Sequence, residues 1–404
     1  MADYQVTIDA ADLQALFHGD DGVRVLMEKV VNQILQAQAT EQLRAAPSER
    51  TEERQGYRNG TRARKLTTRV GTLTLRIPQL REGQLSTELF ARYQRSEQAL
   101  VLALMEMVVN GVSTRKISAI TEELCGTEFS KSTVSGLCKR LDPIVTAWNT
   151  RPLQDQHYPF LLVDALVLRI REEDQVQSWS ALVATGVNAQ GYREVLGLGL
   201  GDSESEGTWT AFFRSLKDRG LQGVDWVISD DHRGLVKAVH AQFQGATWQR
   251  CQTHTMRNIL EVTPKGHRSR LHADVRAIFE APDPSKARTL LAAVVSEWTP
   301  VAPQAVKVLE GAFEAATAIL VLPERYRQRL RTTNSQERLN EEIRRRERVI
   351  RIFPNQASVF RLVGALLMEL HEKWTTGTRY LDMEEYAQWR AERAAAPGKV
   401  VTLG

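Results

Sequence analysis

The sequence has little cysteine, no long apolar run and, over one stretch, no acidic residue at all. Its three cysteines, Cys125, Cys138 and Cys251, are too few and too scattered among 404 residues to frame a disulfide-stabilised fold, so a reducing cytoplasm is the expected setting. No run of 18 or more apolar residues occurs, which argues against a transmembrane helix and a membrane partner. The first four residues lack the basic flank and apolar core of a secretory signal.

The stretch without acidic residues runs from Arg54 to Arg81 and contains eight basic residues. The net charge of +4 says little by itself, but a local block of one sign matters when the partner is a polyanion. A solvated surface normally mixes both signs, so the block favours a nucleic-acid partner. The candidate DNA contacts in it are Arg58, Arg62, Arg64 and Lys65.

A second basic cluster lies between Arg325 and Arg351. Three consecutive arginines on one helix cannot all face inward, so phosphate contact is a hypothesis for this cluster. The alternative is a solvated face paired with Glu341, Glu342 and Glu347. The candidate residues are Arg344, Arg345, Arg346 and Arg348.

The first 150 residues indicate helices around a small β unit. Apolar spacing predicts helix over residues 1–45, and alternation predicts strands over residues 66–78 with a turn at Gly71. Residues 97–150 are helical again and contain a helix-turn-helix candidate. Its first helix buries Ile117, Ile120 and Leu124 and ends at Gly126.

The second helix of this candidate starts after Ser130 or Ser132, either of which is a suitable N-cap. Val134, Leu137 and Leu141 form its buried face. Its opposite face suits a recognition helix in a DNA major groove, although helix pairs like this are also common as plain packing units. That face carries Lys131, Ser132, Ser135, Lys139 and Arg140.

From Pro159 onward the pattern becomes mixed α/β. Strands are expected over residues 160–170, 179–187 and 195–200, then a helix over 208–219, a strand over 224–228, a helix over 234–243 and a short strand over 246–251. Residues 270–322 show only helical signals, and helices resume over 334–348 and 358–374. The last twenty residues are expected to be loosely ordered.

Three acidic residues in this region are candidate catalytic groups. Asp164 lies inside an apolar strand, where an unpaired carboxylate is costly, and the alternative is a structural aspartate paired with an arginine such as Arg171. Asp230 ends a strand, and the alternative is a helix cap; its neighbour Asp231 is a rival ligand. Glu337 follows Asn334 by three residues, which is also a capping-box pattern.

Paired acids of this kind suit phosphoryl transfer on DNA. Two divalent ions about 4 Å apart activate the attacking oxygen and stabilise the leaving oxygen. Mg²⁺ prefers oxygen ligands, and carboxylates supply them. We therefore expect Mg²⁺ as the cofactor, with Mn²⁺ as a substitute.

Several segments together resemble the bacterial Mutator-like transposases encoded by insertion sequences. The likeness runs from about residue 20 to residue 375. It is carried by the segments 56–60 (GYRNG), 109–116 (VNGVSTRK), 163–165 (VDA), 228–235 (ISDDHRGL), 249–254 (QRCQTH), 257–258 (RN), 332–337 (TTNSQE) and 352–355 (IFPN).

The resemblance implies an α/β RNase H-like catalytic core, with a mixed sheet and an all-α insertion before the last acid. It assigns Asp164, Asp230 and Glu337 as the metal-binding catalytic acids, and so favours Asp230 over Asp231. The implied regions are a helical region (1–48), a basic β unit (49–96), a helix-turn-helix domain (97–152), the first part of the core (153–262), the insertion (263–330), the final core helices (331–375) and a tail (376–404).

The implied activity is transposition. The partners would be double-stranded DNA, namely the terminal inverted repeats and the target, and a second copy of the chain in a dimer or higher multimer at the bacterial nucleoid. Two rival functions stay open: a catalytically silent DNA-binding regulator, and a metal nuclease that cuts without joining.

Three further residues are expected to support the active site. Cys251 and His254, with His267 and His272, mimic zinc-finger spacing, but Pro264 and Gly266 interrupt the helix that a finger needs. The family pattern implies packing and hydrogen bonding beside the acids for Cys251 and His254 instead. Trp209 is assigned to the same support, with a core position as the alternative to stacking on DNA.

Overall fold

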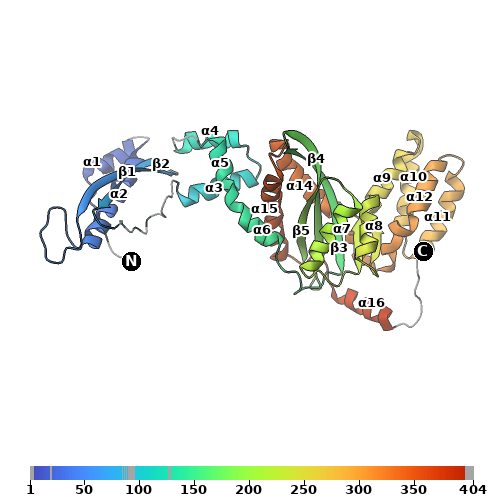
Figure 1. Cartoon of the computed structure of the whole chain (residues 1–404). Helices are drawn as coiled ribbons and strands as arrows, with labels where there is room; N and C mark the ends of the chain where they lie inside the picture. The colour runs from blue at the N-terminus through green and yellow to red at the C-terminus, as the bar shows by residue number, and fades with distance from the viewer. Residues whose placement is uncertain are drawn as a thin grey trace. The chain divides into compact units, whose positions relative to one another are not determined.

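The computed structural model describes residues 4–18, 21–83, 85, 87, 89, 96–125 and 129–395. The chain divides into two compact units, Met1–Arg140 and Leu141–Gly404 (Figure 1). Within the described residues, no helix is both long enough and apolar enough to cross a membrane.

The N-terminal unit contains a β-hairpin that packs on a long helix. The two strands of the hairpin are antiparallel, and the last pair before the turn is Thr68 with Gly71. The side chains of Leu66, Leu73 and Leu75 are buried against Leu35 of the helix. The predicted basic β unit is therefore a hairpin, longer than the 66–78 segment. The elements are α1 (Ala10–His18), α2 (Gly22–Leu43), β1 (Arg58–Thr68), β2 (Gly71–Leu80), α3 (Gln98–Val109), α4 (Thr114–Cys125) and α5 (Lys131–Cys138).

Helices α3, α4 and α5 pack on one another. Ile117 of α4 and Val134 of α5 are fully buried, as their spacing predicted, whereas Leu137 is only half-buried. Ser130 caps α5 by accepting a hydrogen bond from the backbone N–H of Thr133 at 3.1 Å. The predicted helix end at Gly126 and the side chain of Leu124 lie outside the described residues.

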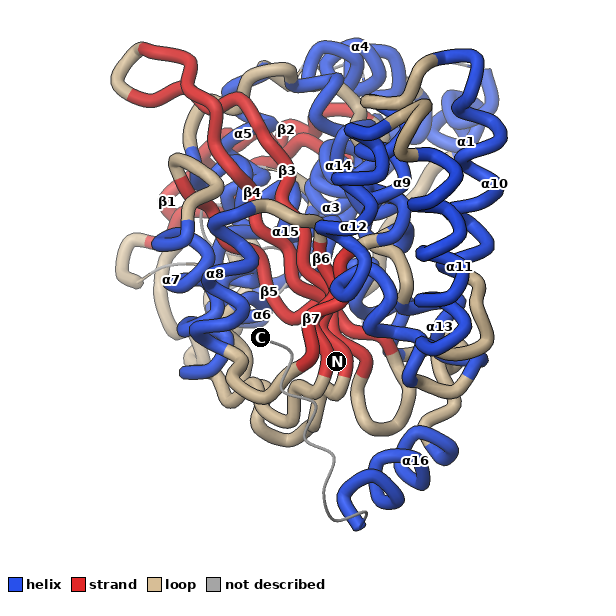
Figure 2. Tube along the Cα trace, turned by 90° about the vertical axis from the view of Figure 1, so that its right-hand side faces the viewer, coloured by secondary structure: helices blue, strands red, loops and turns tan. Residues whose placement is uncertain are grey.

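The C-terminal unit is built on one mixed five-stranded sheet of order β5-β4-β3-β6-β7. The three antiparallel strands are β3 (Phe160–Glu172), β4 (Gln175–Val187) and β5 (Arg193–Gly201), and β6 (Trp226–Ser229) and β7 (Thr247–Arg250) continue it in parallel with β3. The prediction of a mixed α/β domain is confirmed. In Figure 2 the sheet stands between α7 (Glu206–Asp218) and α8 (Arg233–Gln242) on one side and the later helices on the other.

Both faces of this sheet are covered, so its inner strands are almost continuously apolar. Leu161 and Val163 of β3 point to the core under α7 and α8, which contains Trp209. Phe160 and Leu162 point to the opposite core. Successive side chains of a strand alternate between faces, so Asp164 projects on the same face as Phe160 and Leu162.

Some of the remaining helices contact the sheet, and another group, between residues 259 and 320, forms a separate core. As predicted, residues 270–322 are helical; Leu271, Phe279, Trp298 and Phe313 are among those that pack together there. The elements are α6 (Asp142–Asn149), α9 (Gln252–Glu261), α10 (Arg268–Phe279), α11 (Pro284–Trp298), α12 (Pro303–Thr317), α13 (Glu324–Leu330), α14 (Asn334–Ile350), α15 (Gln356–Thr375) and α16 (Glu384–Ala395), with 3₁₀ turns at Lys139–Leu141, Lys265–His267 and Ala318–Val321.

The expectation of a loosely ordered C-terminal end is wrong for residues 385–395. Helix α16 forms there, and Tyr386 is buried in the same core as Phe160 and Trp226. The Tyr386 hydroxyl donates to a carboxylate oxygen of Asp225 at 2.8 Å. One buried aromatic side chain thus fastens a helix whose exposed face is charged, which explains why apolar spacing alone did not reveal it.

One pH-dependent contribution to stability comes from His371 of α15. Its ring lies near Trp148 and Arg151 of the same unit, and burial, followed by the charge of Arg151, lowers the pKa of His371 to about 4. The same histidine in the unfolded chain titrates near pH 6.5. Between these values the folded state binds fewer protons than the unfolded state, so stability falls as the pH drops from about 6.5 to about 4.

We expect the free energy of unfolding of this unit to fall by about 1–2 kcal/mol across that window because of His371, since partial solvent exposure screens the full shift. His371→Gln removes this contribution. Thermal melting at pH of about 7.5 and about 5 measures it, with His272→Gln, on an exposed face of α10, as the control. An equal acid-induced loss in all three proteins would contradict the assignment.

Candidate active site

Asp164 and Asp230 lie side by side on neighbouring parallel strands. Strand β3 pairs with β6 in the register Leu162↔Ile228, and continuing this register by two residues aligns Asp164 with Asp230, directly after the end of β6. Both therefore project on the sheet face covered by α14. The sequence prediction placed these two acids at one site, and the structure brings them together.

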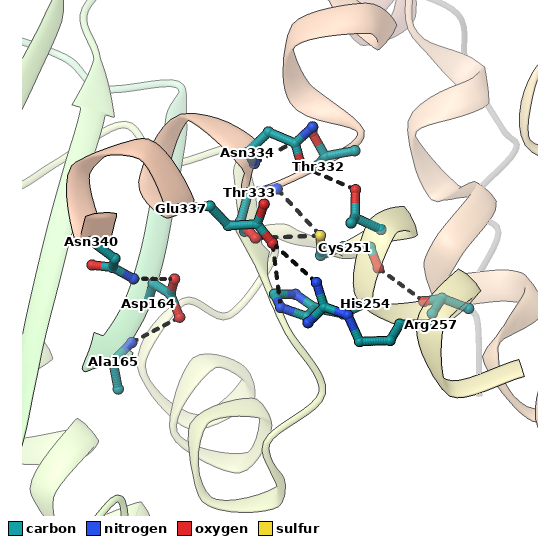
Figure 3. Close-up of polar contacts among 12 residues, drawn as sticks. Asp164, Ala165, Cys251, His254, Arg257, Thr332, Thr333, Asn334, Glu337 and Asn340 are labelled. Carbon is teal, nitrogen blue, oxygen red and sulfur yellow. Dashed lines mark hydrogen bonds and ion pairs between the residues drawn. The ribbon is translucent and has the colours of Figure 1, made fainter. Parts of the chain in front are cut away.

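The Asp164 carboxylate is largely buried and has only neutral hydrogen-bond donors. One oxygen accepts from the backbone N–H of Ala165 at 2.9 Å and the other from the Asn340 amide of α14 at 2.8 Å (Figure 3). Burial, followed by the negative charge of Asp230, raises the pKa of Asp164 from 3.8 to about 7. Within the described residues, Asp164 makes no ion pair with an arginine, which was the structural alternative.

Asp231, the rival of Asp230, has a separate partner. Its carboxylate lies 2.5 Å from a guanidinium nitrogen of Arg250, which is almost entirely buried. An ion pair with Arg250 is a structural role, and it leaves Asp230 as the acid that faces Asp164.

Glu337 lies in the first turn of α14 and turns toward α9. Its carboxylate is 3.6 Å from Nε2 of His254 and 3.8 Å from a guanidinium nitrogen of Arg257 (Figure 3). The capping-box alternative is not realised, because the N-cap of α14 is Thr333 and makes no side-chain cap. The sequence pattern that suggested a structural glutamate was therefore coincidental.

His254 contacts Glu337 and Cys251. It lies beside Glu337, and the charges of Asp230 and Asp164 contribute to raising its pKa, after the larger effect of its contact with Cys251. The Cys251 sulfur accepts hydrogen bonds from both the backbone N–H and the hydroxyl of Thr333, each at 3.3 Å. Burial would raise the pKa of Cys251, but these bonds and His254 lower it on balance. Cys251 and His254 thus join α9 to the start of α14.

Three side chains on α14 attach this helix to β3. Gln336, which is buried, donates to the carbonyl of Leu162 at 3.0 Å, Asn340 donates to Asp164, and Arg344 reaches the carbonyl of Val167 at 3.4 Å. Beyond the helix, the backbone of Phe353 pairs with Arg169 and Arg171. The helix that carries Glu337 therefore runs along the strand that carries Asp164.

Sequence reasoning missed Glu204. Its carboxylate lies 3.4 Å from Nδ1 of His232 and accepts a hydrogen bond from the Trp209 indole at 3.3 Å. Burial first, and also the charge of Asp230, raise the pKa of Glu204. Trp209 is fully buried, so its core alternative holds, and it also contacts the site through Glu204. No local motif marks Glu204, because its loop meets the Asp230 loop only in the fold.

The predicted DNA-contacting residues have different surroundings. On the hairpin, Arg62 and Lys65 are exposed, whereas Arg58 donates to the carbonyl of Ala45 and the hydroxyl of Thr40. The residues of α5 and its end, Lys131, Ser132, Ser135 and Lys139, are all exposed.

The basic cluster of α14 is largely paired with its own acids. Arg344 pairs with Glu347 at 3.0 Å, and Arg345 and Arg346 both pair with Glu342. Arg346 is buried, while Arg348 is exposed. In three of the four cases, pairing within the helix is therefore the arrangement present.

The donors around Asp164 and Asp230 fit a hard divalent cation. Two carboxylates of like charge lie together, and burial, followed by the charge of Asp230, raises the pKa of Asp164. Among the described residues, the groups that donate hydrogen bonds to Asp164 are neutral. Over the described part of the chain, however, no three histidine, cysteine, aspartate or glutamate side chains are close enough to hold a metal ion jointly. Glu337, held by His254 and Arg257, stands apart from the pair.

Comparison with known proteins identifies the family of the chain. The pattern that defines the Mutator family of transposases matches residues 1–377. The chain belongs to the Mutator family of transposases.

Individual relatives match almost end to end. The transposase for insertion sequence element IS256 in transposon Tn4001 of Staphylococcus aureus is 43% identical over 391 residues, which cover 95% of this chain and 100% of that protein. The transposase for element ISRM5 of Rhizobium meliloti (strain 1021) is 44% identical over 94% of this chain and 95% of its own length. That for element IS1081 of Mycobacterium tuberculosis is 40% identical over 92% and 90%.

The hydrogen bond from Gln336 to Leu162 gives a test of how α14 is attached. Gln336→Leu leaves a buried carbonyl without this partner, so we expect a loss of about 1–3 kcal/mol in the free energy of unfolding. Gln304→Leu, at an exposed position of α12, is the matched control and should change it by no more than about 0.5 kcal/mol. Denaturant unfolding measures both; equal effects would show that Gln336 does not hold the helix.

Proposed function

We propose that this transposase binds the terminal inverted repeats of its own insertion sequence and cuts and joins DNA with Asp164, Asp230 and Glu337. The core that presents these acids would be RNase H-like: a three-strand antiparallel meander extended by two parallel strands. The observation that carries the proposal is the alignment of Asp164 with Asp230, with Asn340, from the helix of Glu337, bonded to Asp164.

The proposed reaction has two phosphoryl transfers. Water attacks a phosphodiester at the end of the element, the bond from phosphorus to the 3′ oxygen breaks, and a 3′-OH is released. That 3′-OH then attacks a phosphodiester of the target, again displacing a 3′ oxygen, so one strand is joined and one new 3′-OH is formed. Neither step needs a covalent intermediate with the protein.

Magnesium, held by the oxygens of Asp164 and Asp230 with Glu337 as the third acid, would activate the attacking oxygen and neutralise the leaving one. Manganese would substitute. Asn340 fixes the orientation of the Asp164 carboxylate, and His254 and Arg257 pair with the Glu337 carboxylate.

DNA recognition is proposed for the N-terminal unit. The exposed Arg62 and Lys65 of the hairpin suit phosphate contacts, and the exposed face of α5, with Lys131, Ser132 and Ser135, suits a recognition helix of a helix-turn-helix pair. Two DNA ends have to be paired for joining, so a dimer or higher multimer is part of the proposal.

The acids can be tested with purified protein, Mg²⁺ and labelled DNA carrying both ends of the element. Asp230→Asn removes one of the two aligned carboxylates, so we expect nicking and strand joining to fall by about a hundredfold or more. Asp231→Asn makes the same chemical change one residue away, at the carboxylate paired with Arg250, and should leave most of the activity. Gel mobility of the labelled strands measures both steps.

Each other outcome selects a different function. Cleavage without joined products, abolished in Asp230→Asn, would identify a metal nuclease. DNA binding without cleavage, in Mg²⁺ and also in Mn²⁺, would identify a silent DNA-binding regulator. Loss of activity in Asp231→Asn with activity retained in Asp230→Asn would reverse the assignment of the second acid.

A further inference from the structure

A cavity of about 610 Å³ lies beside the first turns of α14. Its walls come from the start of β5, from α13, from the first turns of α14 and from the end of α15 with the segment that follows. The residues that matter here are Arg193, Arg329, Arg338, Trp374 and Tyr380, with Thr332 and Asn334 at the α14 end.

Three arginines meet in this cavity without an acidic partner. Within the described residues, no carboxylate lies at ion-pair distance from Arg193, Arg329 or Arg338, in contrast to the paired arginines farther along α14. The one acid in the lining, Glu342, already pairs with Arg345 and Arg346. The arrangement therefore concentrates positive charge that the protein itself does not neutralise.

Arg193 is the most constrained of the three. Its buried Nε has no hydrogen-bond partner, and burial, opposed by the nearby Tyr380 and reinforced by the charges of Arg329 and Arg338, lowers the pKa of Arg193. Holding three like charges together is unfavourable unless an anion joins them. The cluster is thus incomplete without a ligand.

Two aromatic rings hold the guanidinium groups in place. Arg193 lies 3.4 Å from the centroid of the Trp374 ring and 5.0 Å from that of Tyr380, and Arg329 lies 4.8 Å from the Tyr380 centroid. A guanidinium that lies on a ring face keeps the N–H groups at its edge for an acceptor. Because the rings already contact arginines, the cavity suits an anionic group better than a stacked base.

The cavity adjoins the acids through the start of α14. Thr332 and Asn334 line it, and Figure 3 shows both next to Glu337, which follows Asn334 by one helical turn. A second cavity of about 500 Å³ shares Gln328, Thr332 and Asn334 with the first and continues toward α9, which carries His254 and Arg257. The arginine cluster and Glu337 are therefore joined through the start of α14, within about one helical turn of each other.

We propose that Arg193, Arg329 and Arg338 bind a phosphate of a DNA strand that extends beyond the acid site. The contact is to the sugar–phosphate backbone and carries no base preference, so it positions the strand while the N-terminal unit recognises the sequence. The choice of DNA as the source of the phosphate rests on the proposed function. Free phosphate would bind the arginines by the same chemistry, and the experiment distinguishes free phosphate from DNA.

The experiment measures binding of labelled element-end DNA by fluorescence anisotropy at several salt concentrations without Mg²⁺. Neutralising the two exposed arginines in Arg329→Gln/Arg338→Gln should lower the slope of log K against log [salt] by about one, the value for one lost phosphate contact. Arg329→Lys/Arg338→Lys keeps the charges and should keep most of the slope. Arg270→Gln/Arg288→Gln removes the same charge from ion-paired sites on α10 and α11 and should leave it unchanged.

A slope equal to that of the unmodified protein, or a fall matched by Arg270→Gln/Arg288→Gln, would overturn the proposal. So would a result in which inorganic phosphate raises the melting temperature through these arginines while the DNA slope stays constant, because the cavity would then serve free phosphate. The measurement needs no cleavage. A protein that never cuts DNA would refute the proposed function, but the salt dependence of its DNA binding would still test the three arginines.

Discussion

The repulsion between Asp164 and Asp230 is the constraint that organises the C-terminal unit. Two carboxylates on adjacent parallel strands, one of them largely buried, are unfavourable for folding, and burial with mutual charge is what raises the pKa of Asp164. Apolar side chains of similar size would make a more stable sheet at these positions. The surrounding structure has to hold the pair in place, and the attachment of α14 to β3 does this.

That attachment also explains how a distant part of the chain reaches the site. The segment between Asp230 and Glu337 includes a strand and a set of helices with its own core, so it folds on itself and returns the chain to the sheet. Contacts with β3 fix the position of the returning segment. They begin with the bond from Gln336 to the Leu162 carbonyl and end with the backbone bonds of Phe353. The helix that carries Glu337 is thereby positioned by its contacts with β3, and the Glu337 carboxylate pairs with His254 and Arg257 of α9.

Local patterns were enough to predict most elements and to single out Asp164 as a candidate. The apolar run from Phe160 to Ile170, interrupted only by Asp164, predicted a strand with an unusual carboxylate, because a continuous apolar run is visible in the sequence itself. The helical region over 270–322 was predictable for the same reason: its apolar spacing is local.

The parts that the sequence did not reveal depend on contacts between distant segments. Glu204 matters because its loop meets His232 and Asp230, and α16 forms because Tyr386 enters a core made by other elements. The ion pairs of Arg344, Arg345 and Arg346 were foreseen only as an alternative, since spacing on a helix permits pairing and solvent contact equally. The arginine cavity joins residues from four segments and has no linear signature.

The position of Glu337 late in the chain has a consequence for biosynthesis. The hairpin and helices of the N-terminal unit leave the ribosome first, and the sheet with Asp164 and Asp230 follows. The proposed third acid arrives only with α14, after the whole helical insertion has been made. Under the proposed function, the surfaces proposed to bind DNA are therefore synthesised before the third acid, and a chain that terminates before α14 would carry those surfaces without the complete set of proposed acids.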